Sequence, residues 1–192
     1  MRFPAICAFA LAALAPSASA ASLSIVLDFE AAPSLQSVAE MKREFEGILK
    51  PSRLAFDYKT RRQAEQVASE DLVVVRFKGQ CVLNPGPTVA ESGTLGFSYT
   101  VGGNVQPFGE IDCDRVVRAV GSAVSAVDYL RSDELLGRAL GRVLAHEIVH
   151  MLSGSVAHAR DGVAYKELTG RMLIAPELHL AARDFARIHL DR

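Results

Sequence analysis

Three of the five histidines of this chain lie in one stretch, RVLAHEIVHMLSGSVAHARDG, which runs from Arg142 to Gly162. His146 and His150 are four residues apart, so on a helix both imidazoles project from the same face. Two nitrogens about one turn apart can bind a single Zn²⁺ ion. Glu147 lies about 100° around the helix from His146, where its carboxylate can reach a water molecule on the ion without becoming a ligand. The spacing H-E-x-x-H therefore predicts a metal site that activates water.

A catalytic zinc site needs a third protein ligand and one position open to water. His158 lies beyond His150 and past a helix end that we expect at Gly154. A chain that turns back at this glycine would carry His158 to the metal. Glu177, near the start of a later predicted helix, and Asp161 are the alternatives for the third ligand. The remaining two histidines are expected to be solvated or packed: His179 and His189.

The segment resembles the active-site helix of the zincin metallopeptidases, which carries H-E-x-x-H. More narrowly, HEIVHMLSGSVAHARDG resembles a group of short exported bacterial zincin-like proteins. These read H-E-I-G-H-L-L-L-G, then a histidine, then G-I-M or G-L-M. The resemblance implies a zincin-like single domain over residues 21–192. It also implies that His146, His150 and His158 bind Zn²⁺ and that Glu147 is the general base.

Two residues depart from the pattern of that group. Val149 stands where the group has glycine, which a helix tolerates. Ala164 stands where the group has a methionine that packs beneath the metal, and Met172 is a nearby residue that could replace it. The longer metzincin pattern is not met either, because Ser153 and Val156 occupy the positions of its glycine and third histidine. We therefore expect a zincin-like site with a smaller hydrophobic floor.

Zn²⁺ held by three neutral imidazoles lowers the pKa of a bound water to roughly 7. We expect Glu147 to take a proton from that water as it attacks a peptide carbonyl, and to pass a proton to the leaving amine. Tyr165 could donate a hydrogen bond to the developing oxyanion if its loop folds over the site. A peptide or protein substrate is expected to pair along an exposed strand at Gly93–Val101. The sequence thus predicts a zinc metallopeptidase, which is a hydrolase.

Three other functions stay open at this point. The chain could be an exported protein that binds zinc without turnover, a zinc hydrolase that acts on a cell-wall peptide or a small amide, or a toxin or immunity-like partner of another exported protein. Glu147 favours chemistry, because a site without turnover has no need for a carboxylate between its ligands.

The N-terminus has the features of a secretory signal peptide. It opens with Arg2, continues through an apolar stretch to Leu14, and ends in the small residues before Ala20. This pattern predicts cleavage after Ala20, and the apolar stretch is shorter than the roughly 20 residues that span a bilayer. We therefore expect a secreted or periplasmic protein that is not membrane-associated once residues 1–20 are removed.

The cysteines and the charge of the chain narrow its class further. Cys7 leaves with the signal peptide, so Cys81 and Cys113 remain as an even pair in an oxidising compartment. This predicts a Cys81–Cys113 disulfide. The formal net charge of −1 provides no basic field, so nucleic acid is not an expected partner.

Hydrophobic periodicity predicts one domain of α/β or α+β class, with an edge strand, the active-site helix and a C-terminal helix. The zincin resemblance implies that the sheet is small, twisted and mixed. Strands are expected at 22–29, 53–59 and 72–79, a hairpin within 95–113, and helices at 34–49, 117–130, 133–152 and 176–190.

Overall fold

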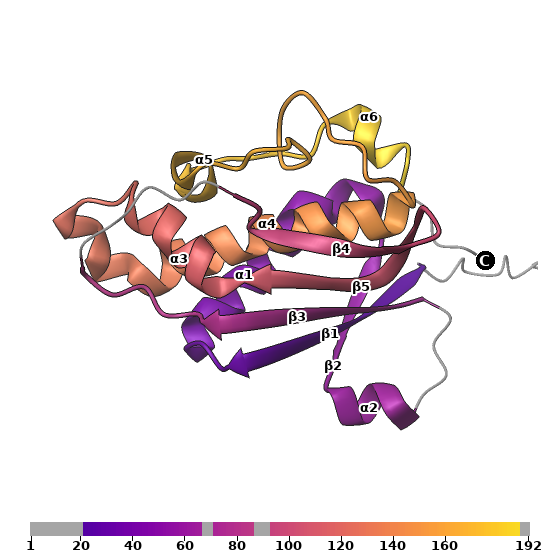
Figure 1. The fold of residues 1–192 in the computed structure, drawn as a ribbon, viewed down its shortest axis with the longest axis horizontal. Coiled ribbons are helices and arrows are strands. Elements are labelled where there is room, and N and C mark those ends of the chain that lie inside the picture. Colours follow the sequence, from indigo (N-terminus) through magenta and orange to yellow (C-terminus); the bar gives the residue numbers. More distant parts are fainter. Residues whose placement is uncertain (1–20, 67–70, 87–92, 189–192) are drawn as a thin grey trace, which may run out of the picture.

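The computed structural model describes residues 21–66, 71–86 and 93–188. These residues form one five-stranded sheet, and most of the helices lie against one face of it (Figure 1). The predicted signal peptide at 1–20 and His189 lie outside the described residues. The elements are β1 Ser22–Ala31, α1 Leu35–Leu49, η1 Lys50–Ser52, β2 Ala55–Lys59, α2 Arg61–Gln66, β3 Leu72–Gln80, β4 Gly96–Val101, β5 Asn104–Asp112, α3 Cys113–Gly121, η2 Ala126–Arg131, α4 Ser132–Ser153, α5 Gly170–Ile174 and α6 Ala182–Phe185.

The sheet is mixed, and its strand order is β2-β1-β3-β5-β4. β1 is parallel to β2 and β3, and β3 is parallel to β5, whereas β4 runs antiparallel to β5 at the edge. In β3, Val73, Val75 and Phe77 are buried at every second position, because successive side chains of a strand point to opposite faces. The predicted combination of a mixed sheet, an edge strand and helices is confirmed.

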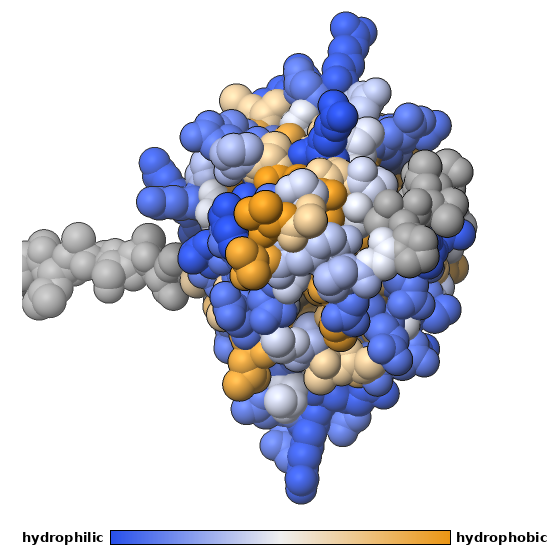
Figure 2. Space-filling model, turned by 90° about the vertical axis from the view of Figure 1, so that its left-hand side faces the viewer, coloured by the Kyte–Doolittle hydropathy of each residue, from blue (hydrophilic) through white to orange (hydrophobic). Residues whose placement is uncertain are grey.

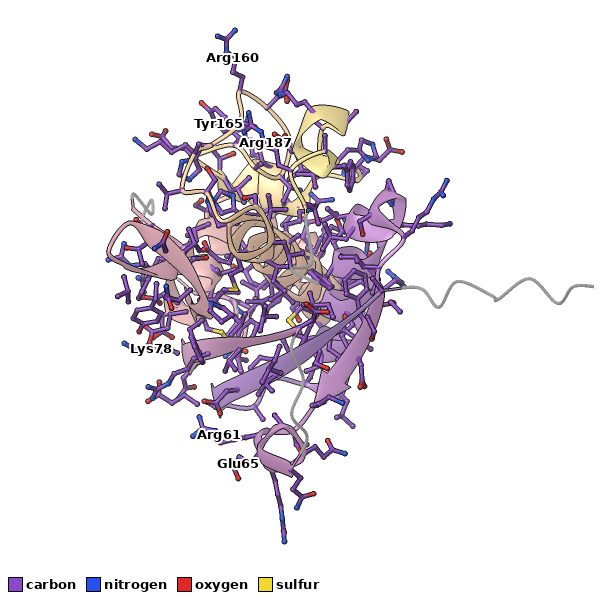
Figure 3. The ribbon with its side chains drawn as sticks, turned by 90° about the vertical axis from the view of Figure 1, so that its right-hand side faces the viewer. Arg61, Glu65, Lys78, Arg160, Tyr165 and Arg187 are labelled. Atoms are coloured by element: carbon purple, nitrogen blue, oxygen red, sulfur yellow. A yellow bond between two sulfur atoms is a disulfide. The ribbon has the colours of Figure 1, made fainter. Side chains whose placement is uncertain are left out.

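Helix α4 lies between the sheet and the C-terminal segment, as its end-on view in Figure 3 shows. It packs closely against α1 because two glycines face that helix. A Cβ atom at Gly137 would lie 2.5 Å from the carbonyl oxygen of Ser37, and one at Gly141 would lie 2.6 Å from that of Met41. The two backbones can therefore approach to a distance that a larger residue would prevent.

Arg142 ties α4 to both of its neighbours. Its side chain is fully buried and donates to Glu44 Oε1 of α1 (2.7 Å) and to the carbonyl oxygen of Met172 (2.5 Å). A buried charge is tolerated when it is paired and hydrogen-bonded in this way. The position of α4 is thus set from the α1 side and from the C-terminal side.

The prediction of a long C-terminal helix is wrong over most of its length. Residues 176–181 are not helical, and within the described residues 176–188 only the short α6 is helical. The carbonyl oxygen of His179 accepts a hydrogen bond from the backbone N–H of Val163 (2.9 Å), and Leu180 is buried. Tertiary contacts of this segment override the helical pattern of its sequence.

The predicted helix at 117–130 forms as two pieces. α3 begins earlier, at Cys113, and ends at Gly121. A capping box then starts η2, in which Asp128 accepts hydrogen bonds from the backbone N–H (2.7 Å) and the hydroxyl (2.8 Å) of Ser125. Residues that favour caps can start a new helical segment where periodicity alone would continue the old one.

The predicted Cys81–Cys113 disulfide forms, with a Cα–Cα distance of 4.9 Å. It joins the residue after β3 to the first residue of α3, and both cysteines are buried. Its sequence separation is 32 residues. A loop of this size gives a stabilisation of about 4 kcal/mol in the chain-entropy model.

The end of the molecule at which α1 and α4 begin has hydrophobic side chains near its centre (Figure 2). Large hydrophobic residues of the elements there are strongly exposed, namely Leu35, Val127 and Leu130. None of the three lines the cavity described below.

Within the described residues, no helix combines the length and the apolar character that crossing a bilayer requires.

Candidate metal centre

The chain turns back immediately after α4, as the sequence predicts. Gly154 adopts a left-handed conformation with φ of 60°, and its backbone N–H bonds to carbonyl oxygens of the last helical turn. Glycine adopts this conformation without steric cost, so it ends helices readily. The reversal brings the loop that contains His158 back toward the face of α4 that carries His146 and His150.

His146, His150 and His158 form one cluster, and their nearest ring nitrogens all lie within 4.8 Å of one another. The ring centroid of His158 lies 5.2 Å from that of His146 and 4.9 Å from that of His150. His146 and His150 are buried, whereas His158 is exposed. The cluster could therefore hold a metal ion that is reached from the His158 side.

The two alternatives for the third ligand lie in other pairs. The Asp161 carboxylate accepts a hydrogen bond from Arg183 (2.6 Å), and Glu177 lies 3.4 Å from His179. Both carboxylates are more than half exposed. Among the described residues, the structure thus brings His158, rather than Asp161 or Glu177, to the histidine pair.

Backbone carbonyls orient the two helical histidines. His146 Nδ1 lies 2.8 Å from the carbonyl oxygen of Val163, and His150 Nδ1 lies 2.7 Å from that of Ser155. A carbonyl oxygen only accepts, so both Nδ1 atoms carry the proton and donate it. In a neutral imidazole the other nitrogen is then unprotonated. Both Nε2 atoms are therefore available as ligands, and a backbone partner of this kind is typical of metal-binding histidines.

The two Nε2 atoms face each other at 3.1 Å. With both Nδ1 atoms protonated, neither Nε2 has a hydrogen to donate, so two lone pairs meet without a hydrogen bond between them. A cation bound to both nitrogens removes this repulsion. Tetrahedral ligands with bonds of 2.0–2.1 Å lie roughly 3.3 Å apart. The donor set therefore fits a divalent metal ion, although the spacing alone does not identify the metal.

Burial keeps these histidines neutral. Desolvation lowers the pKa of His146 to about 4, and it also lowers the pKa of His150. The pKa of His158 is lowered by desolvation, by His150 and by the positive charge of Lys166. Neutral imidazole is the form that binds a metal. The three side chains are thus in their metal-binding form at neutral pH.

Glu147 is buried beside the histidines and held by the edge strand. The hydroxyl of Ser98 in β4 lies 2.9 Å from Glu147 Oε2 and 3.1 Å from the Glu147 carbonyl oxygen. Gly96 leaves room for this carboxylate, since a Cβ atom there would lie 3.0 Å from Glu147 Oε1. Desolvation raises the pKa of Glu147 to about 7, and the Ser98 hydrogen bond opposes the rise. A carboxyl group with a pKa near neutrality suits proton transfer at physiological pH.

A cavity of about 680 Å³ contains His146, Glu147, His150 and His158. Its walls come from residues 93–98 at the start of the edge strand, from α4, from the end of α3 and from residues 166–170. Apolar and polar side chains both line it, as in most small-ligand sites. The cavity joins the histidine cluster to the strand that the sequence predicts as the substrate-binding edge.

Other predicted residues are less well placed. Tyr165 and Met172 are not among the described residues that line the cavity, so their roles stay predictions. Figure 3 shows Tyr165 in the C-terminal segment, on the side of α4 away from the sheet. Lys166, the next residue, does line the cavity, and it was not singled out from the sequence. Ala164, at the position of the methionine, is buried.

The chain matches no protein-family model, and a search of curated proteins finds no relative.

The raised pKa of Glu147 has a testable effect on the stability of the metal-free protein. The folded state binds this proton more tightly than the unfolded chain, whose carboxyl has a pKa near 4.5. The stabilisation is therefore complete below pH 4.5 and is lost as the pH rises through about 7. Glu147→Gln removes the ionisation, so this variant should be more stable than the wild type at pH 8, by up to about 3 kcal/mol. Urea unfolding with a chelator present measures the difference.

The same comparison at pH 4 provides the control, because there the wild-type carboxyl is protonated in both states and the two proteins should be similar. His146 acts in the opposite direction: its lowered pKa costs stability as the pH falls from 6.5 toward 4. This histidine is present in both proteins, so its effect cancels. A stability difference that does not change between pH 4 and pH 8 would contradict the raised pKa.

Proposed function

We propose that this protein is a zinc metallopeptidase of zincin type. The observation that carries the proposal is the pair of unprotonated Nε2 atoms of His146 and His150, which face each other at 3.1 Å with His158 beside them. Zinc is the metal that best suits three neutral imidazoles and one open position. The buried carboxylate of Glu147 in the same cavity favours hydrolysis over metal storage or a structural role.

In this proposal each side chain has one task. His146, His150 and His158 hold the ion, which, when bound, polarises a substrate carbonyl and makes water more acidic. Glu147 takes a proton from the attacking water and delivers one to the leaving nitrogen. Its burial supports this role, because desolvation keeps its pKa close to the working pH. Lys166 adds a positive charge at the cavity wall, where it could stabilise developing negative charge.

The edge strand supports a peptide as the substrate. The backbone N–H of Asp112 donates to the carbonyl oxygen of Leu95, so Leu95 faces β5 with its backbone groups. Backbone direction alternates along an antiparallel strand, so the N–H and C=O groups of Gly96 and Ser98 point away from β5. Both residues line the cavity. An extended peptide can add to such an edge by main-chain hydrogen bonds.

Export remains part of the proposal. Removal of residues 1–20 as a signal peptide would leave the catalytic domain outside the cytoplasm, where a Cys81–Cys113 disulfide persists. The alternative function, an exported zinc-binding protein without turnover, predicts the same metal content and no hydrolysis.

The proposal is tested with the chain from residue 21 onward, an unfolded protein substrate such as casein, and a chelator. We expect hydrolysis by the zinc-loaded protein, loss of hydrolysis after chelation, and recovery when zinc is added back. Metal content measured on the same samples separates the alternatives. Bound zinc without hydrolysis of casein or of short peptides would support the non-catalytic function, and absence of bound metal would refute both.

A further inference from the structure

The edge strand β4 contacts the cavity through two small residues that lie on the same face. Gly96 and Ser98 are two positions apart, so both are directed toward α4. The side chain of Glu147 extends from α4 toward these two residues. Its Oε2 is 2.9 Å from the Ser98 hydroxyl, and its Oε1 is 3.0 Å from the position of a Cβ atom at Gly96. The strand thus provides a hydrogen-bond donor for one carboxylate oxygen and space for the other.

The Ser98 hydroxyl has one hydrogen and two acceptors within reach, both of them on Glu147. The carboxylate oxygen is the nearer, at 2.9 Å against 3.1 Å for the carbonyl oxygen. A hydrogen bond to a charged acceptor is also about twice as strong as one to a neutral acceptor. In the described part of the chain, Ser98 donates a hydrogen bond to this carboxylate. It therefore restricts the orientation of this buried carboxylate.

We propose that Ser98 is a positioning residue for the general base. The inference rests on the proposed function, and it adds that one strand orients both reactants. A peptide bound to the outward-facing backbone groups of Gly96 and Ser98 is held by the same two residues that contact the Glu147 carboxylate. The Ser98 hydrogen bond thereby links the orientation of the base to the strand that holds the peptide, so it constrains the distance between them. Such distances matter, since a displacement of about 1 Å can reduce a rate about 100-fold.

The test compares Ser98→Ala, Ser98→Thr and Thr60→Val in the zinc-loaded protein. Ser98→Ala should lower kcat about 10- to 100-fold and leave KM within about twofold, because the side-chain hydroxyl contacts the base and not the peptide backbone. Ser98→Thr keeps a hydroxyl at the same position and should restore most of kcat. Thr60→Val removes a hydroxyl from an exposed position outside the cavity and the edge strand, and it should behave like the wild type.

Three outcomes overturn the inference without affecting the proposed function. They are normal kcat in Ser98→Ala, a loss of kcat that Ser98→Thr does not restore, and a rise in KM that alone accounts for the loss. Hydrolysis that survives Glu147→Gln overturns the proposed function itself, and the inference with it.

A measurement that needs no turnover checks the contact directly. In the metal-free protein, Ser98→Ala should lower the melting temperature by several degrees in the wild-type background, because it leaves a buried carboxyl without its donor. The loss should be much smaller in the Glu147→Ala background, since the shared interaction is then already absent. Equal losses in the two backgrounds would show that Ser98 acts independently of Glu147 and would overturn the inference.

Discussion

Replacement of Glu147 by glutamine should reduce hydrolysis about 1,000-fold while the metal stays bound. General acid–base catalysis typically contributes 100- to 10,000-fold, and glutamine cannot accept the proton of an attacking water. The substitution preserves the contacts and the size of the side chain. The amide oxygen of glutamine can still accept the hydrogen bond from Ser98, and the side chain has the same size in a tightly enclosed position. The loss should therefore appear in kcat rather than in the fold or the metal content.

The measurement is initial-rate hydrolysis of casein by zinc-loaded proteins of known metal content. Glu177→Gln is the matched control, because its carboxyl is 80% exposed and lies outside the cavity. It should retain wild-type activity. If Glu147→Gln keeps more than about a tenth of the wild-type rate, Glu147 is not the base, since the loss would then be below the usual contribution of such a group.

Replacement of His158 by alanine should weaken metal binding by at least about 100-fold. Changes to residues that only orient a ligand cost 10- to 100-fold in affinity, so removal of a ligand should cost no less. His158 is also the exposed member of the cluster and lies on a loop. Its loss should therefore leave the metal-free fold as stable as before, and any fall in metal content can be assigned to coordination.

Zinc titration against a chromogenic chelator measures the affinity, and metal analysis after desalting measures retention. His179→Ala is the control, because His179 is 79% exposed and pairs with Glu177 outside the cavity. This variant should bind zinc like the wild type. Wild-type affinity in His158→Ala, combined with a loss in Glu177→Ala or Asp161→Ala, would transfer the role of third ligand to that carboxylate.

Much of the candidate site follows from local sequence patterns. The spacing of His146 and His150 determines their common face, and Gly154 ends the helix in the conformation that glycine favours. The turn allows His158 to return to the pair, but the sequence leaves Glu177 and Asp161 open as third ligands, and the fold brings His158 to the pair. The common face and the helix end depend on contacts between residues that are close in the sequence, so periodicity and cap residues are sufficient to predict them.

The remaining parts of the site depend on contacts between distant segments. Ser98 meets Glu147 across a separation of 49 residues, and this contact exists because β4 occupies the edge of the sheet beside α4. No spacing rule relates a strand position to a helix position of this kind. The short C-terminal helix has a similar cause, since the bond between Val163 and His179 gives the chain an alternative to helical hydrogen bonds. Tertiary packing of this type is where sequence patterns lose their predictive value.

The acceptors for His146 and His150 are main-chain oxygens of Val163 and Ser155, and this has a consequence for genetic variation. Every amino acid supplies a carbonyl oxygen, so exchanging the residue type at either position does not delete the acceptor. A changed loop length between them would displace the Val163 oxygen, whereas Ser155 stays bonded to His150 at the end of α4. We therefore expect evolving copies of this chain to accept different residue types at these two positions, while insertions and deletions there are selected against.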